Sequence, residues 1–347
     1  MNKKLKKFLH TFFKIFIIFL LGTAAINIII FAAVYFNHTS KLSKEEGYLV
    51  PPGQMVEVDG HDMHVWVTGN EDAKDVLVFL HESKITDDSI ALQPLFKELD
   101  EYKIVYVDRS GFGFSEVSGQ PRDIDTVLEE TRLAIKGAGV EGPYNIVALG
   151  TSGVEAIHWA NTYKDEVVSI IGIDMYYPEQ FANTTTEKYC GFFDYMMVPF
   201  YKLGGQRFIK ELYPVNTYGV YNDVQMTIRK ALISKNGYTK DMYEEDLAMV
   251  DNAGKVAQEG LPDTEMFLIY ANPFLEPYVT IDDTVNAKYV EQSEANPDVD
   301  LVAEYNRWLR EYFDEYENIA VEEMSGPGRL YTYNPEELAS IIEDYLE

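Results

Sequence analysis

Residues 15–36 form the feature that most restricts how this chain can fold. The stretch reads IFIIFLLGTAAINIIIFAAVYF, and its only clearly polar residues are Thr23 and Asn27. A stretch of this length is enough to cross the hydrocarbon core of a bilayer as one helix. The apolar part of a signal peptide has only about 7–15 residues, so the length favours an uncleaved anchor. Small residues leave a cleaved signal peptide open as the alternative: Ala24, Ala25, Ala32 and Ala33.

The charges beside this stretch predict its orientation. The basic residues among the first forty all precede it, and no acid accompanies them: Lys3, Lys4, Lys6, Lys7 and Lys14. Basic residues accumulate on the cytoplasmic side of membrane helices, which places residues 1–14 in the cytoplasm. We therefore expect a single-pass protein of the cell membrane whose main domain is extracytoplasmic.

The rest of the chain is strongly acidic. After the first forty residues it carries 24 basic and 57 acidic residues, a net charge of −33. Such a field repels the phosphates of nucleic acids, so we expect no nucleic-acid partner. Residues 37–53 are polar and end in Pro51-Pro52-Gly53, which is typical of a linker between a membrane and a folded domain.

Beyond the linker, short apolar runs alternate with helical patterns. A hairpin is predicted first, with strands over 54–58 and 61–67 joined by Asp59-Gly60. An apolar face over 123–139 predicts a helix packed on a sheet. Apolar runs typical of buried parallel strands recur through the chain: 76–80, 104–107, 144–149, 167–173 and 266–270. This alternation predicts an α/β fold with a mostly parallel, doubly wound sheet.

Residues 178–262 interrupt the alternation. They are rich in aromatic and amphipathic helical patterns, so we expect a helical lid inserted between two parts of one core, 54–177 and 263–347. After the strand at 266–270 we expect a helix over about 300–316, a short strand at 319–321 and a last helix. The last helix begins with an N-cap, a first-turn proline and a capping acid, Asn334, Pro335 and Glu337.

Three segments, in this order, resemble the α/β-hydrolase superfamily over about residues 51–347. The first is the loop Asp108-Arg109-Ser110-Gly111-Phe112-Gly113-Phe114-Ser115. The second is a strand, the turn Gly150-Thr151-Ser152-Gly153-Val154 and a helix, the setting of a nucleophile elbow. The third is Asn334-Pro335-Glu336-Glu337 at the start of the last helix. The resemblance implies a serine hydrolase of ester or amide bonds, with Ser152 as the nucleophile.

The histidine that should activate this serine is missing. A serine hydroxyl is almost wholly protonated at neutral pH and needs a general base, which in this superfamily follows the nucleophile in sequence. All six histidines precede residue 159. At the place implied by the resemblance the chain has Gly328 or Tyr331. We therefore expect impaired activity.

The resemblance also implies an oxyanion hole and a catalytic acid. Backbone N–H groups of Gly153, Glu82 and Ser83 are the expected oxyanion donors, although a carboxylate at Glu82 carries the wrong charge for that place. Two residues are open as the acid, Asp174 or Glu276. No cofactor and no metal ion are expected, because the chain has neither a metal-ligand cluster nor a phosphate loop.

His81 is the one histidine that could replace the missing base. It ends the strand over 76–80, at the edge where open α/β sheets bind ligands. It could pair with Ser152 or serve as a structural hydrogen bonder. Two functions follow: a hydrolase that acts on a small-molecule substrate under the lid, or a catalytically degenerate pseudoenzyme that binds or senses a ligand there. Both are attached to the membrane by the N-terminal helix.

Overall fold

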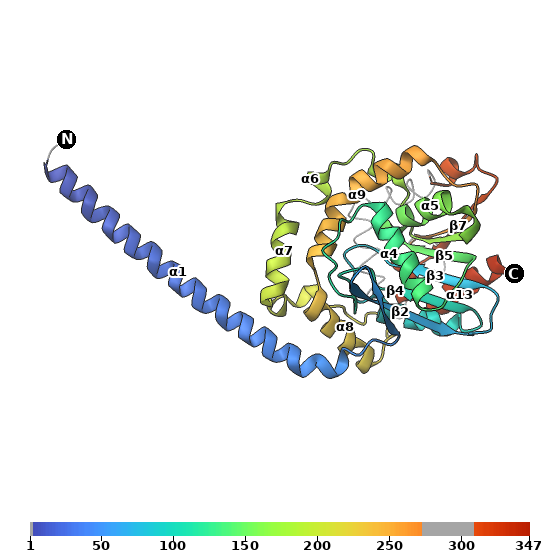
Figure 1. Ribbon diagram of the computed structural model, residues 1–347, viewed down its shortest axis with the longest axis horizontal. Helices are drawn as coiled ribbons and strands as arrows, with labels where there is room; N and C mark the ends of the chain where they lie inside the picture. Colours follow the sequence, from blue (N-terminus) through green and yellow to red (C-terminus); the bar gives the residue numbers. More distant parts are fainter. Residues whose placement is uncertain (1–2, 273–308) are drawn as a thin grey trace.

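The computed structural model describes residues 3–272 and 309–347. Helix α1, Lys3–Glu45, projects away from the rest of the molecule (Figure 1). Its apolar part has a mean hydropathy of 2.7 and none of it is buried inside the molecule. By length and composition α1 can therefore cross a membrane.

Helix α1 extends further than the sequence pattern indicates. It continues through Glu45, and a 3-10 turn follows at Glu46–Tyr48, so most of the expected linker is helical. His38 and Glu45 of this extension bind Arg207 of the lid. These tertiary contacts stabilise a helix end that its polar sequence does not predict.

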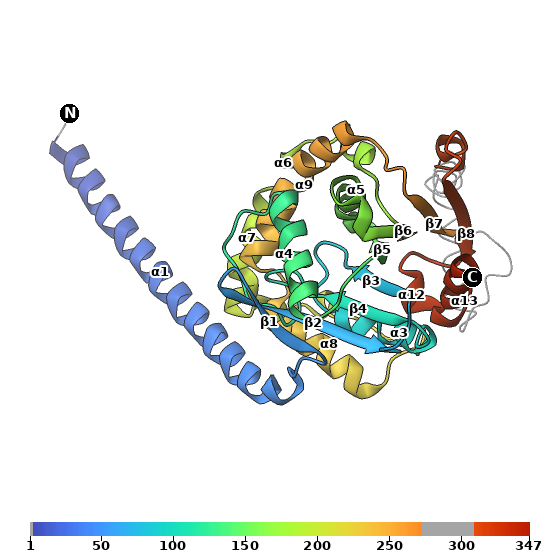
Figure 2. The same ribbon diagram turned by 45° about the vertical axis from the view of Figure 1, so that its right-hand side comes forward.

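The strands form a mixed sheet in the order β1-β2-β4-β3-β5-β6-β7-β8 (Figure 2). Strand β2 pairs antiparallel with β1 and β4, and all other pairs are parallel. Asp59 and Gly60, both with positive φ, make the turn of the first hairpin. The predicted fold class is confirmed. The bounds are Gln54–Val58, His61–Gly69, Val76–Leu80, Lys103–Val107, Tyr144–Leu149, Val167–Ile173, Glu265–Asn272 and Ile319–Ser325.

Helices cover both faces of the sheet. Helices α4 (Ile124–Gly137) and α5 (Gly153–Thr162) bury apolar side chains on one face. Helices α3 (Gln93–Glu98) and α13 (Pro335–Leu346) cover the other face. Asn334 caps α13 by accepting a hydrogen bond from the Glu337 amide at 3.3 Å, as the sequence predicts.

Between β6 and β7 the described chain contains helices and loops. This segment is the lid, and its longest helices are α7 (Phe192–Leu203), α8 (Asp223–Asn236) and α9 (Lys240–Glu259). Helix α9 packs on α5, while α7 and α8 contact the end of α1 (Figure 1). The lid therefore touches both the sheet domain and the apolar helix.

Candidate functional site

The turn that follows β5 is made by Gly150, not by Ser152. Strand pairing continues through Leu149, and Gly150 then takes a φ of +51° before α5 begins. A Cβ atom on Gly150 would lie 2.7 Å from Cδ and 2.8 Å from Oε1 of Glu82. The carboxyl group of Glu82 therefore occupies the space above the turn.

Ser152 lies two residues further on, at the start of a helix. Its φ is −68° and its side chain is buried. The Leu149 amide donates to Ser152 Oγ at 2.8 Å, and Oγ lies 2.9 Å from the carbonyl oxygens of Leu80 and Leu149, to which it donates. The hydroxyl therefore points inward and links β3 to the turn, whereas the nucleophile of an elbow is exposed above the sheet.

His81 does not pair with Ser152. Its Nε2 accepts a hydrogen bond from the Arg109 amide at 3.1 Å, and its Nδ1 donates to the Glu82 carbonyl at 2.9 Å. Burial lowers the pKa of His81 well below its ordinary value, and the charge of Arg109 lowers it further. A neutral imidazole with both nitrogens bound to backbone groups has no nitrogen left to serve Ser152. Of the two roles expected for His81, these contacts support that of a structural hydrogen bonder.

Two of the expected oxyanion donors are already engaged. The Ser83 amide donates to Thr151 Oγ1 at 2.8 Å, and the Gly153 amide bonds to the carbonyls of Gly150 and Thr151 within the turn. Burial raises the pKa of Glu82, and the nearby carboxylate of Asp174 raises it further, although the charge of Arg329 acts in the opposite direction. Two of the three expected amides are therefore unavailable to an oxyanion, and the Glu82 carboxyl group lies beside Gly150.

Asp174 lies where the catalytic acid of this fold could lie. It follows β6 with a φ of +46°. Its Oδ1 accepts from the Ala271 amide at 2.8 Å and its Oδ2 from the Arg329 amide at 3.2 Å. Burial raises its pKa, and these two donors lower it in part. Glu276, the other expected acid, lies outside the described residues.

The position of the missing base can now be assigned between the two expected residues. A Cβ atom on Gly328 would lie 4.0 Å from Asp174 Oδ2. Tyr331 instead is buried and donates its hydroxyl to Asp88 Oδ1 at 3.2 Å. Of the two residues, Gly328 is thus the one whose side chain would meet Asp174.

No protein-family model matches the chain. The YbdG protein of Bacillus subtilis (strain 168) is 30% identical to it over an alignment that covers 97% of this chain and 99% of YbdG. Solved structures share its fold at low identity. The enol-lactonase of Burkholderia xenovorans LB400 matches with a TM-score of 0.55 at 12% identity, covering 84% of this chain and 99% of the lactonase. The chain belongs to the YbdG family and has the α/β-hydrolase fold.

Two other structures support the same fold for this YbdG relative. Cfl2 of Burkholderia cenocepacia has a TM-score of 0.56 at 14% identity, over 85% of this chain and 95% of Cfl2. The ancestral haloalkane dehalogenase AncHLD2 has a TM-score of 0.55 at 14% identity, over 84% of this chain and 98% of the dehalogenase. An enol-lactonase and a haloalkane dehalogenase are named for different reactions, so the likeness shows the fold alone.

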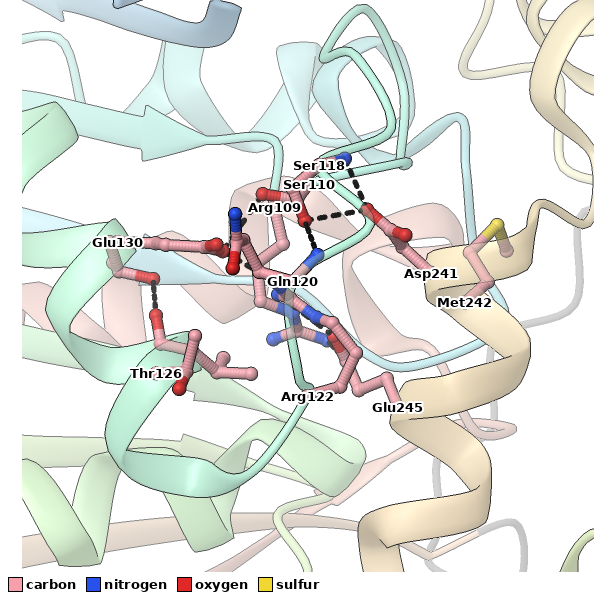
Figure 3. A network of polar contacts seen from close by, with 12 residues as sticks. Arg109, Ser110, Ser118, Gln120, Arg122, Thr126, Glu130, Asp241, Met242 and Glu245 are labelled. Atoms are coloured by element: carbon pink, nitrogen blue, oxygen red, sulfur yellow. Dashed lines mark hydrogen bonds and ion pairs between the residues drawn. The ribbon is translucent and has the colours of Figure 1, made fainter. Parts of the chain in front are cut away.

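In this member of the YbdG family a buried ionic network connects the lid to α5, the helix that follows the elbow and is called the elbow helix below. The Arg109 guanidinium donates to Glu155 of α5 at 3.0 Å and to Glu245 of α9 at 2.7 Å. Arg122 donates to Glu130 at 2.6 Å beside it (Figure 3). A cavity of about 20 Å³ lies between Ser152 and the lid, room for about one water molecule.

Sequence reasoning missed several residues of this site. Gly150 was taken as part of the elbow but not as its turn residue. Arg109 and Glu245 were not predicted to pair, because a buried ion pair between distant segments leaves no local pattern. The sequence did contain a signal that Gly150 makes the turn, since this glycine immediately follows the predicted strand. Among the residues that the structure describes, no group of three His, Cys, Asp or Glu side chains is placed to hold a metal ion.

Proposed function

We propose that this protein is a catalytically degenerate, membrane-anchored member of the α/β-hydrolase superfamily that binds or senses a small molecule. One observation carries the proposal: the turn residue after β5 is Gly150, and the Glu82 carboxyl group fills the place of its side chain. Acyl transfer needs a hydroxyl or thiol at that turn. Under this proposal Ser152 is a structural residue.

The surroundings of Gly150 support the same proposal. Gly328 provides no imidazole next to Asp174, and the Ser83 amide is bound to Thr151. In serine hydrolases the loss of one triad member costs several orders of magnitude in rate. Here nucleophile, base and an oxyanion donor are all lacking at their usual places.

The lid supports a role in sensing. It binds the elbow helix through Arg109 and the end of α1 through Arg207. A ligand that shifts the lid would therefore change both its contact with the elbow helix and its contact with α1. With α1 in the membrane and the lysines before it in the cytoplasm, the lid and the sheet domain are extracytoplasmic.

A fluorophosphonate probe, which reacts with activated serines, tests the proposal against a Ser152 hydrolase. The purified full-length protein and its Ser152→Ala variant are incubated with the probe, with an active serine hydrolase added to each tube as a positive control. We expect the control enzyme to be labelled and the two proteins to give equal, background signals. Rapid labelling of the parent that is lost in Ser152→Ala would refute the degenerate function.

A further inference from the structure

A pocket of about 510 Å³ opens where the end of α1 meets the lid. Its walls come from α1, from the turns at 205–212 that follow α7, and from α8, and Figure 1 shows α1 joining the body beside α8. The volume is in the range of small-molecule sites. The lining residues that carry the argument are Lys41, Glu45, Arg207, Lys210, Val215 and Lys230.

The pocket is positively charged in a chain that is otherwise acidic. It contains four cationic side chains and one carboxylate, that of Glu45. Both oxygens of Glu45 accept from Arg207, at 2.8 and 2.6 Å. Within the described residues no carboxylate lies within 4.0 Å of the three lysine ammonium groups. Three cations thus remain available to an anionic ligand.

The position of the pocket along α1 places it near the membrane surface. The apolar stretch ends at Phe36, and Lys41 follows five residues later in the same continuous helix. At about 1.5 Å per residue this is about 7.5 Å along the axis. The polar headgroup layer on each side of a bilayer is about 5–8 Å thick. Lys41 therefore lies at the depth of lipid headgroups.

The rim of the pocket suits the same surroundings. Val215, which lines it, is 78% exposed, and Phe208, next to the lining residue Arg207, is 66% exposed. Apolar side chains beside lysines are typical of protein surfaces at the membrane interface. The exposed rim offers contact to the glycerol or acyl part of a lipid whose headgroup the lysines hold.

We propose that this pocket binds the phosphate-bearing headgroup of an anionic membrane lipid. Ammonium groups of lysine bind phosphate as point charges, and their attraction to anionic lipid is strongest close to the membrane surface. The proposal rests on the membrane anchoring included in the proposed function. A bound lipid would fix the lid against α1, because Lys41 lies on α1 and Lys210 and Lys230 lie on the lid.

Native mass spectrometry of the full-length protein in a neutral detergent tests this site. The probes are dioleoyl phosphatidylglycerol and, as a neutral reference, dioleoyl phosphatidylcholine. We expect tighter binding of phosphatidylglycerol, and a loss of about tenfold or more in its affinity in the Lys210→Gln/Lys230→Gln variant. The matched control, Lys74→Gln/Lys188→Gln, removes two exposed lysines outside the pocket and should leave the affinity unchanged. Equal affinity in the parent and the pocket variant would overturn the proposal.

Two further measurements separate the alternatives. Addition of inorganic phosphate distinguishes a lipid from a soluble phosphate: displacement of phosphatidylglycerol at millimolar phosphate would overturn the lipid assignment, and persistence of the lipid supports it. Alkaline carbonate extraction of membranes tests anchoring separately, since retention in the membrane supports the basis of the proposal and release removes it. Fluorophosphonate labelling bears only on catalysis, so its outcome leaves this site unaffected.

Discussion

The carboxyl group of Glu82 lies in the space that a side chain on Gly150 would need, with Cδ only 2.7 Å from the position of the absent Cβ. The two residues come from the ends of neighbouring parallel strands, β3 and β5. A side chain at position 150 would require the Glu82 carboxyl group to move away. Under the proposed function, these two residues and Gly328 are the positions to change in order to create a hydrolase site.

Rebuilding the triad should restore reactivity towards a fluorophosphonate. The Glu82→Gly/Gly150→Ser/Gly328→His variant frees the space, adds a hydroxyl and places an imidazole next to Asp174. We expect labelling at least about tenfold faster than in Glu82→Gly/Gly150→Ala/Gly328→His, which lacks the hydroxyl. Positive φ at 150 costs both variants about 1–3 kcal/mol, so equal melting temperatures (Tm) check that they fold alike. Equal labelling of the two would contradict the assignment of position 150.

Ser152→Ala should destabilise the protein. The substitution removes the donor to Leu80 and Leu149 and the acceptor for the Leu149 amide inside a buried turn. Leaving buried partners unsatisfied costs about 1–3 kcal/mol, which lowers Tm by a few degrees. Ser340→Ala, at an exposed position of α13, is the control and should leave Tm almost unchanged. An unchanged Tm in Ser152→Ala would argue against a structural role for this serine.

Asp88 should make stability depend on pH. Burial, with the charge of Asp87, raises its pKa to about 8, and one of its carboxyl oxygens has no hydrogen-bond partner. The unfolded carboxyl has a pKa of about 3.9, so between about pH 4 and pH 8 the folded protein holds a proton that the unfolded chain releases. The proton on Asp88 therefore stabilises the folded protein fully below about pH 4, and this stabilisation is lost as the pH rises through about 8.

Urea unfolding at pH 5 and pH 8 measures this contribution. The parent should lose about 2–4 kcal/mol of unfolding free energy more than Asp88→Asn does over this interval. Asp72→Asn, at an exposed position, should follow the parent. Parallel behaviour of the parent and Asp88→Asn would show that Asp88 does not carry the proton.

Arg207 and Glu45 should be energetically coupled across the joint between the lid and α1. Their side chains are 7% and 28% exposed, and the guanidinium binds both carboxylate oxygens. A double-mutant cycle with Arg207→Gln and Glu45→Gln should give a coupling of about 1–3 kcal/mol. Hydrogen exchange should also quicken at residues 38–45 in Arg207→Gln. The comparison is the pair Lys240 and Glu244, one helical turn apart on α9 and 61% and 32% exposed, with an expected coupling below about 0.5 kcal/mol. Similar coupling energies for the two pairs would show that Arg207 and Glu45 do not hold the lid to α1.

Local sequence patterns predicted most of the fold. The strands over 76–80, 144–149 and 167–173 have the bounds that the apolar runs indicate, because strands buried on both faces need continuous apolar sequence. The cap of α13 at Asn334 follows from the hydrogen bond that its own side chain makes. The helical end of α1 was not predicted, since it depends on Arg207 from a distant segment.

The sequence by itself determined the strands, the α/β class, the apolar span and the absence of a histidine after residue 158. Tertiary structure alone decided which residue makes the elbow. Gly150 and Ser152 both lie in a run of small residues, and either could take the turn if read in isolation. Pairing of Ala148 with Leu80 and of Leu149 with Ile173 holds the strand in place up to Leu149. The turn must therefore begin at Gly150, and Ser152 falls into the helix, where its hydroxyl is buried.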